Sequence, residues 1–400
     1  MKRALQPLLM AALVGGWVLS THAAAQAQTT FDVYGFVMTD IGFNDIGVDP
    51  EWFDVQRPTK LPSFEDEFGD EGSAFFSVRQ TRFGVKTTTP TDMGDLKTQF
   101  EWELFGTGVD AGQTTLRLRH AYGELGKFGA GQTWSPFMDI DVFPNTVEYW
   151  GPNGMVFFRN VQFRWMPIQG ETRMTIALER PGASGDQGVY ADKIDFAGIT
   201  PRFPLPDLSA EFRKAFSRGY VELSGIVRKI EWEDLSGGPL DLSGDVTGWG
   251  VHVSSNLKIR PEDVLRLSFV YGEGIENYMN DAPVDVGTEP NPGDPITPIV
   301  GVALPVTGVV AFLDHNWNSQ WATSVGYSMV EIDNSEGQAP DAFKKGQYML
   351  ANLMFMPVSS VMMGVEGGWI HRENNSDGFD VDQYHVQASF KYSFATTLGR

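Results

Sequence analysis

The sequence of 400 residues contains no cysteine. The chain therefore has no disulfide framework and no thiolate metal site, and cysteine usage does not indicate its compartment. Basic residues are also scarce, since 30 Lys and Arg stand against 51 Asp and Glu and give a formal net charge of −21. Because phosphate contacts need clustered Lys and Arg, this balance argues against a protein that binds nucleic acid.

Long hydrophobic runs are absent after the N-terminal segment, and no apolar period of 3.6 residues persists for three helical turns. The longest later apolar stretch, 298–313, is interrupted by Pro305 and Gly308, so it favours a strand that leaves a loop. A complete G-x-S-x-G elbow and an H-E-x-x-H motif are both missing. The sequence therefore predicts no transmembrane helix, no catalytic residues, no cofactor and no metal site.

Residues 1–27 have the order of a secretory signal peptide. Lys2 and Arg3 precede an apolar stretch, and small residues in an Ala-x-Ala pattern follow it. The apolar stretch is too short to span a bilayer as an anchor, although a retained anchor is the alternative interpretation. We expect export from the cytoplasm and cleavage near Ala25 or Ala27.

The remaining chain alternates between polar and apolar residues. In residues 95–106, DLKTQFEWELFG, the odd positions are charged or polar and the even positions are mostly apolar, which is the period of a β-strand. The sequence predicts an all-β chain with 16 strands, at 31–43, 75–87, 95–105, 114–125, 127–135, 160–166, 172–180, 207–216, 220–232, 246–259, 263–274, 306–317, 320–332, 346–356, 360–370 and 381–394.

The connections between these strands alternate in length. Short ones such as 126–127 and 318–319 alternate with long ones such as 136–155 and 275–305. This layout is typical of an outer-membrane barrel with tight periplasmic turns and long extracellular loops. We therefore predict a 16-stranded antiparallel transmembrane β-barrel over 28–394. A soluble sandwich with one solvated face is the alternative, but it rarely has so many strands with aromatic residues at their ends.

The last predicted strand carries aromatic residues on one face, as a membrane-interface girdle does. Tyr392 and Phe394 end this face, and we interpret them as the assembly signal of the barrel. Residues 395–400 are short and polar, so they are expected to form a C-terminal extension without strand pairing.

The same alternation of odd and even positions predicts which charged residues face the lumen and which residues face the lipid. Arg117 and Arg119 alternate with Leu116 and Leu118. An arginine that faces lipid at mid-membrane costs about 2–4 kcal/mol, so both arginines are expected to face the lumen. The same alternation gives His120 an outward position, at the membrane interface or at a subunit contact.

Three more basic residues have inward parity, and they are Arg82, Lys86 and Arg164. Because a guanidinium can bind both oxygens of a carboxylate, we expect the inward basic residues to guide anionic solutes. The alternative is that they only pair with carboxylates of the wall, such as Glu101 and Glu103.

Residues 136–154 occupy the place of the third outer loop, which in porins folds inward and narrows the channel. Asp139, Asp141 and Glu148 of this constriction loop are expected to face the arginines and to create a transverse field. A solvated outer loop is the alternative. The other long loops are acidic, and they either bridge to lipopolysaccharide phosphates through divalent cations or are solvated.

Three segments together resemble the DcaP-like porin family of Gram-negative outer membranes: SVRQTRFGVKT, LRLRHAYGELGKFGAGQTWSPFMDIDVFP and GPNGMVFFRNVQFRW. The resemblance is dense over 75–166 and looser towards Phe394. It implies a homotrimeric porin of the cell outer membrane, surrounded by lipid and lipopolysaccharide, that takes up small and often dicarboxylic anions. The chain departs from the family in two features, because it has no room for the N-terminal coiled coil of some members and continues past its last aromatic residue.

Two other functions are compatible with a barrel. One is an outer-membrane lipid hydrolase, which would need a Ser-His pair that faces lipid. The other is a structural or adhesive barrel without a solute pore.

Overall fold

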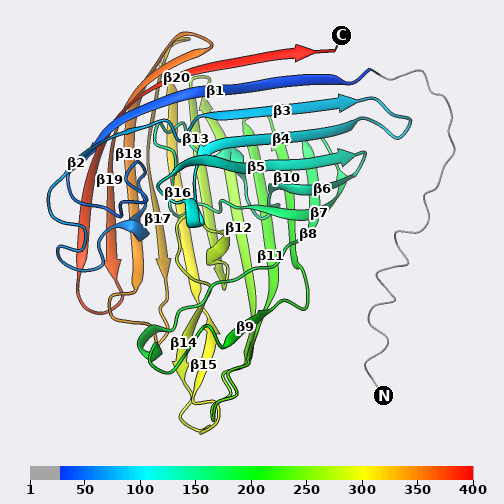
Figure 1. Cartoon of the computed structure of the whole chain (residues 1–400). Helices are drawn as coiled ribbons and strands as arrows, with labels where there is room; N and C mark the ends of the chain where they lie inside the picture. The colour runs from blue at the N-terminus through cyan, green and yellow to red at the C-terminus, as the bar shows by residue number, and fades with distance from the viewer. Residues whose placement is uncertain (1–27, 400) are drawn as a thin grey trace.

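The protein is described here by a computed structural model, which covers residues 28–399. The predicted signal peptide, 1–27, lies outside the described residues. The described strands form a closed antiparallel barrel of 16 strands, so the predicted fold class is confirmed (Figure 1). The barrel closes where β1 (Thr30–Asn44) pairs with β20 (Asp380–Leu398). Within residues 28–399, no helix is long and apolar enough to cross a membrane.

Two positions of the wall are occupied by broken strands. β2 (Ser73–Ser77) and β3 (Arg82–Thr89) both pair with β1, and β9 (Ile199–Arg202) precedes β10 on one side of β11. The other wall strands are β4 (Leu96–Phe105), β5 (Thr114–Leu125), β6 (Phe128–Trp134), β7 (Arg159–Ile168), β8 (Thr172–Glu179), β10 (Asp207–Phe216), β11 (Gly219–Asp234), β12 (Gly244–Arg260), β13 (Asp263–Glu273), β16 (Pro305–Asn316), β17 (Trp321–Ile332), β18 (Phe343–Val358) and β19 (Val361–Asn374).

A separate two-stranded sheet lies beyond the barrel wall, in the long loop between β13 and β16 (Figure 1). It consists of β14 (Val286–Pro290) and β15 (Ile299–Ala303). Between the described strands, the loops contain five single 3-10 turns: η2 (Pro58–Lys60), η3 (Gly108–Asp110), η4 (Ile140–Val142), η5 (Gly188–Tyr190) and η6 (Glu276–Tyr278).

The strand bounds reproduce the predicted alternation of loop lengths. Short turns join β5 to β6 and β12 to β13, whereas long connections leave the opposite end of the barrel. Two of the long loops are used below, namely L1 (45–72) and L3 (135–158). L3 is the third long connection, as the sequence predicts.

β4 shows how the alternation divides the two faces of the wall. Leu96 and Phe100 are 39% and 45% exposed on the outer surface, whereas Glu101 and Glu103 are 6% and 1% exposed inside the barrel. The apolar residues thus face the lipid, where a charged side chain would be costly. The inward position of both carboxylates agrees with the prediction from parity.

A β-bulge in β5 changes this pattern. Glu101 pairs with His120 and Trp102 pairs with Leu118, so Arg119 is an extra residue without its own partner. Because a bulge shifts the alternation by one residue, both Arg119 and His120 point inward. His120 is 3% exposed, and its Nδ1 lies 3.0 Å from the Thr133 hydroxyl. The predicted outward position of His120 is therefore wrong, because a strict period of two does not register the extra residue.

The last strand is longer than predicted. Tyr392 and Phe394 face outward, with 53% and 45% exposure, as expected for girdle residues. β20 continues to Leu398, however, and residues 395–398 pair with residues 31–34 of β1. The predicted boundary of the barrel at 394 is thus four residues short, since polar residues at a strand end still form a backbone ladder.

Deletion of residues 395–400 is expected to weaken the closure of the barrel. The deletion removes the pairing with 31–34 and the hydrogen bond from the Thr397 hydroxyl to Asp32 Oδ1, at 2.6 Å. At roughly 0.5–1.5 kcal/mol per hydrogen bond, the free energy of unfolding should fall by a few kcal/mol. Thermal unfolding, followed by the gel migration of heated samples, measures the loss. Deletion of residues 399–400 alone keeps the pairing of 395–398 and is the control. Equal melting of the 395–400 deletion and the wild type would contradict the expectation.

Candidate functional site

L3 folds into the barrel and bonds to wall strands on different sides of the lumen. Its Gly154 N–H donates to Ser328 Oγ of β17 at 2.9 Å. Its Val147 N–H donates to Glu366 Oε2 of β19 at 2.8 Å. Asp139, at the other end of the loop, bonds to residues of β10, β11 and β12. The loop therefore crosses the interior as a bridge between distant parts of the wall.

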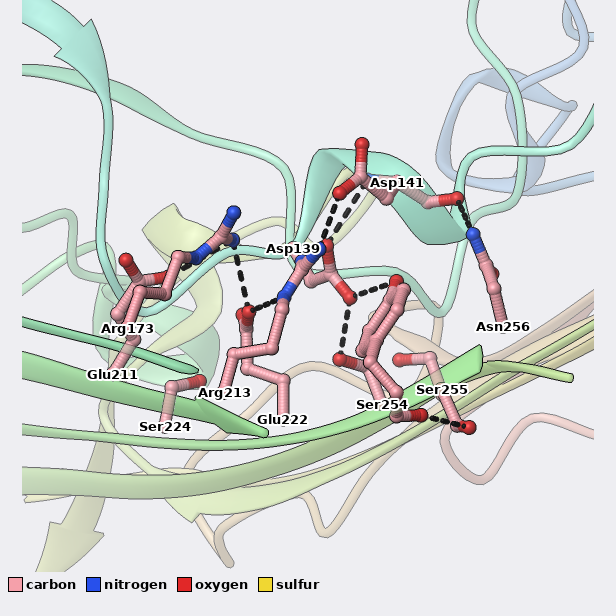
Figure 2. Close-up of polar contacts among 12 residues, drawn as sticks. Asp139, Asp141, Arg173, Glu211, Arg213, Glu222, Ser224, Ser254, Ser255 and Asn256 are labelled. Atoms are coloured by element: carbon pink, nitrogen blue, oxygen red, sulfur yellow. Dashed lines mark hydrogen bonds and ion pairs between the residues drawn. The ribbon is translucent and has the colours of Figure 1, made fainter. Parts of the chain in front are cut away.

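The first anchor of this bridge is Asp139, which is completely buried. Its carboxylate accepts hydrogen bonds from the Tyr220 hydroxyl at 2.6 Å and the Ser254 hydroxyl at 2.7 Å, and it pairs with Arg213 (Figure 2). Asp141 lies beside it with a half-exposed side chain and pairs with Arg213 Nη1 at 2.5 Å. Asp139 thus holds the loop to the wall, and only Asp141 presents its carboxylate to water.

The second anchor is Glu148, which is 1% exposed. Its carboxylate accepts the backbone N–H groups of Gln56, Trp150 and Gly151 at 3.0, 2.7 and 2.7 Å. Burial outweighs these donors and, with the repulsion of Glu366, raises the pKa of Glu148 to about 8. Glu148 therefore shapes the loop from inside, and it does not project the negative charge that the sequence analysis assigned to it.

The basic wall opposite the loop contains three of the predicted arginines. Arg119 is almost fully buried and donates to Glu101 Oε1 at 2.7 Å and to Glu103 Oε2 at 2.6 Å. The side chain of Arg82 is 24% exposed, with Nη2 at 3.2 Å from Glu103 Oε2, and that of Arg117 is 28% exposed, with Nη1 at 3.7 Å from Glu103 Oε1. Pairing with wall carboxylates thus leaves Arg119 almost inaccessible, whereas part of the surface of Arg82 and Arg117 remains accessible to solutes.

A cavity of about 430 Å³ separates this wall from L3. On the loop side most of the lining side chains are apolar or aromatic, so few of them carry a charge that would repel an anion. On the wall side the lining includes four cations. The loop lining includes Ile140, Phe143, Pro144 and Phe157, and the wall cations are Arg82, Arg117, Arg119 and Lys391.

A second basic cavity, of about 630 Å³, lies near the short turn 217–218. Its lining includes Arg213 and Arg266 from the wall. Ile140 and Phe143 line both this cavity and the first one. The apolar turn around η4 therefore lies between two compartments that both contain cations.

Two predicted residues lie outside the cavity of 430 Å³. The Lys86 ammonium lies 5.2 Å from the ring centroid of Tyr34, which is an inward residue of β1. Arg164 bonds to Gln162 Oε1 through Nε at 3.0 Å and lines a separate cavity of about 310 Å³. Both face the interior, as predicted, but the structure does not bring them together with Arg82 and Arg117.

Sequence reasoning missed other cations at the site. The side chain of Arg159 is 5% exposed and its Nη2 lies 3.6 Å from Glu103 Oε1, but Arg159 precedes the predicted strand 160–166 and had no assigned parity. Arg213 was within a predicted strand, and only the folded loop shows that it binds Asp139. Lys391 could have been found, because it has the opposite parity to Tyr392 in the last strand.

Comparison with known proteins supports the barrel assignment. The family model of the DcaP outer membrane protein matches residues 22–279, which is more than half of the chain. No curated protein matches the chain. The outer membrane channel DcaP of Acinetobacter baumannii has a similar solved structure, with a TM-score of 0.73 and 21% identity over 92% of this chain and 99% of that one.

Two further solved structures share the fold at lower identity. An anion-selective porin from Comamonas acidovorans has a TM-score of 0.58 and 9% identity, covering 92% of this chain and 100% of its own. OmpT, an outer membrane protein of Vibrio cholerae, has a TM-score of 0.55 and 14% identity, covering 94% and 100%. The family match confirms the resemblance found in the sequence, and this chain, with its closed barrel and inward loop, belongs to the DcaP outer membrane protein family and is an outer-membrane porin.

Proposed function

We propose that this porin lets small hydrophilic anions, including dicarboxylates, diffuse passively across the outer membrane. The supporting observation is the charge around the cavity of 430 Å³. Four cations line it from the wall, while Glu101 and Glu103 lie behind them. Glu148 also borders the cavity, but its carboxylate accepts backbone N–H groups. A carboxylate that enters the cavity therefore meets more positive than negative charge.

The negative net charge of the chain is compatible with this proposal. Much of the acid lies in the outer loops, and residues 45–73, which include L1, alone carry nine Asp or Glu against two basic residues. Charges separated by more than about 8 Å are largely screened at physiological salt. Selectivity is thus governed by the groups at the narrow part of the lumen, and these are mainly arginines and a lysine.

The variant Arg82→Gln with Arg117→Gln is expected to lose much of its preference for anions. Both arginines are partly exposed to the cavity, and Arg119 and Arg159 still neutralise Glu103 in their absence. The zero-current potential across a potassium chloride gradient measures the preference for wild type and variant in planar bilayers. Arg202→Gln, at an exposed pair with Glu233 outside the lumen, is the matched control. A wild-type channel that prefers cations would overturn the proposal and would assign control to Asp141.

We also propose that the porin is exported through a signal peptide cleaved near Ala25 or Ala27, assembles as a homotrimer and contacts lipopolysaccharide through its outer loops. The trimer is supported by family membership and by the trimer form known for OmpT of Vibrio cholerae. The N-terminal sequence of the mature protein tests the cleavage, and the size of the complex in mild detergent tests the homotrimer.

A further inference from the structure

Lys391 differs from the other cations of the cavity in its partners. It lies on the inward face of β20, where Met38 of β1 and Met362 of β19 are its neighbours across the strands. Within residues 28–399 it forms no ion pair with a carboxylate, whereas Arg82, Arg117 and Arg119 all pair with Glu103. Its methionine neighbours cannot neutralise an ammonium. Lys391 therefore carries an uncompensated positive charge beside the cavity.

An aromatic ring holds this charge close to a second one. The Lys391 ammonium lies 4.3 Å from the ring centroid of Phe36, and the Arg82 guanidinium carbon lies 5.3 Å from the same centroid. The negative face of a benzene ring attracts cations, so Phe36 can retain two groups that repel each other. Both cations and Phe36 line the cavity of 430 Å³. Two like charges held in this way attract a group of opposite charge between them.

We propose that Lys391 and Arg82, positioned by Phe36, form an anion-binding site in this channel. A carboxylate or another small oxyanion binds between the ammonium and the guanidinium, and the rest of the solute lies against the apolar residues Phe143 and Pro144 of L3. This inference rests on the proposed anion preference. It adds that selectivity depends more on Lys391, which forms no ion pair in the described part of the chain, than on Arg119, whose charge is already compensated by Glu101 and Glu103.

The test compares Lys391→Met with Lys391→Arg in planar bilayers. Methionine keeps an unbranched chain among Met38 and Met362 and removes only the charge, and no acid loses its partner. The readouts are the chloride-to-potassium permeability ratio from the zero-current potential and the concentration of inorganic phosphate that half-blocks the chloride current. Lys391→Met should lower the ratio and raise the half-blocking concentration roughly fivefold, as expected for one unit charge near the ion path. Lys391→Arg should retain both values.

The matched control is Lys86→Met. Lys86 is also an inward lysine above an aromatic ring, with its ammonium 5.2 Å from the Tyr34 centroid, but it does not line the cavity. Its loss should change either readout less than twofold. Phe36→Leu keeps both charges and removes the ring, so it should weaken phosphate block while the assembled barrel persists.

The outcomes separate this inference from the proposed function. If Lys391→Met and wild type give the same ratio while the Arg82 and Arg117 double variant loses selectivity, the role of Lys391 is refuted and the anion channel stands. If the wild type itself has no anion preference, the proposed function is refuted, and the inference that rests on it is refuted with it. Gel migration of unheated samples shows whether each variant is assembled, and Lys391→Gln replaces the methionine variant if that one does not assemble. An equal effect of Lys86→Met would also refute the inference, because any lumen charge would then suffice.

Discussion

Arg119→Ala is expected to destabilise the barrel far more than it changes the selectivity of the channel. The side chain of Arg119 is 5% exposed and bonds to Glu101 and Glu103, whose side chains are 8% and 0% exposed. Without Arg119, Glu101 would keep Arg82 Nε at 3.8 Å, and Glu103 would keep Arg82, Arg117 and Arg159. Removing one partner of a buried ion pair typically costs about 3–5 kcal/mol, and the remaining arginines place the expected loss near the lower end of that range. That is a large part of the roughly 5–15 kcal/mol that stabilises a typical folded protein. Urea unfolding in detergent, followed by tryptophan fluorescence, measures the loss.

A compensating variant tests this explanation. Arg119→Ala combined with Glu101→Gln removes the carboxylate that loses its closest guanidinium, while Glu103 keeps Arg82, Arg117 and Arg159, so this variant should recover part of the lost stability. The coupling between the sites in this mutant cycle reports the ion-pair contribution. An Arg119→Ala porin with wild-type stability and altered selectivity would contradict the expectation, and it would return Arg119 to the solute-guiding role that its sequence suggests.

Asp139→Ala is expected to release L3 from the wall and to give a wider channel. The substitution removes the acceptor for Tyr220, Ser254 and one nitrogen of Arg213 at a fully buried position. These three groups lose a shared partner, and each buried donor that stays unpaired costs about 1–3 kcal/mol. Single-channel conductance should rise severalfold, and L3 should become sensitive to protease in the assembled protein.

Asp141→Asn is the matched control for the loosened loop. Asp141 also pairs with Arg213, but its side chain is 49% exposed and water can replace the interaction. Its conductance should stay close to that of wild type. If Asp139→Ala and Asp141→Asn have the same conductance, the other anchors of L3, at Glu148, Glu366 and Ser328, hold the loop without Asp139.

The wall could be predicted from the sequence because each strand faces lipid on one side and water on the other. A shift of such a strand by one residue would turn all of its charged side chains towards the lipid. The face of each residue is therefore strongly determined by the sequence. This constraint located the 16 strands and the inward positions of Arg82 and Arg117. It failed at His120, where the bulge adds a residue, and at Ala395 to Leu398, where backbone pairing continues without an aromatic pattern.

The anchors of L3 could not be predicted in the same way. Alternation assigns a face to a residue, but it does not say which residue lies opposite across the lumen. Asp139 and Tyr220 are 81 positions apart, and Glu148 and Tyr348 are 200 apart. Sequence reasoning therefore assigned Asp139 and Glu148 a charge in the channel, whereas their folded environment uses them to hold the loop.

The same long separations fix an order of events during biogenesis. L3 ends at residue 158, but its partners lie on strands that are synthesised much later, including Tyr220 on β11, Ser328 on β17 and Glu366 on β19. Contacts between such distant positions form late in folding, after the segments between them are in place. L3 therefore reaches its final position only when the wall is nearly complete. A partly inserted chain would be an open sheet in which L3 does not yet narrow the lumen. Closure of the barrel and narrowing of its lumen are consequently coupled, final steps in the maturation of this porin.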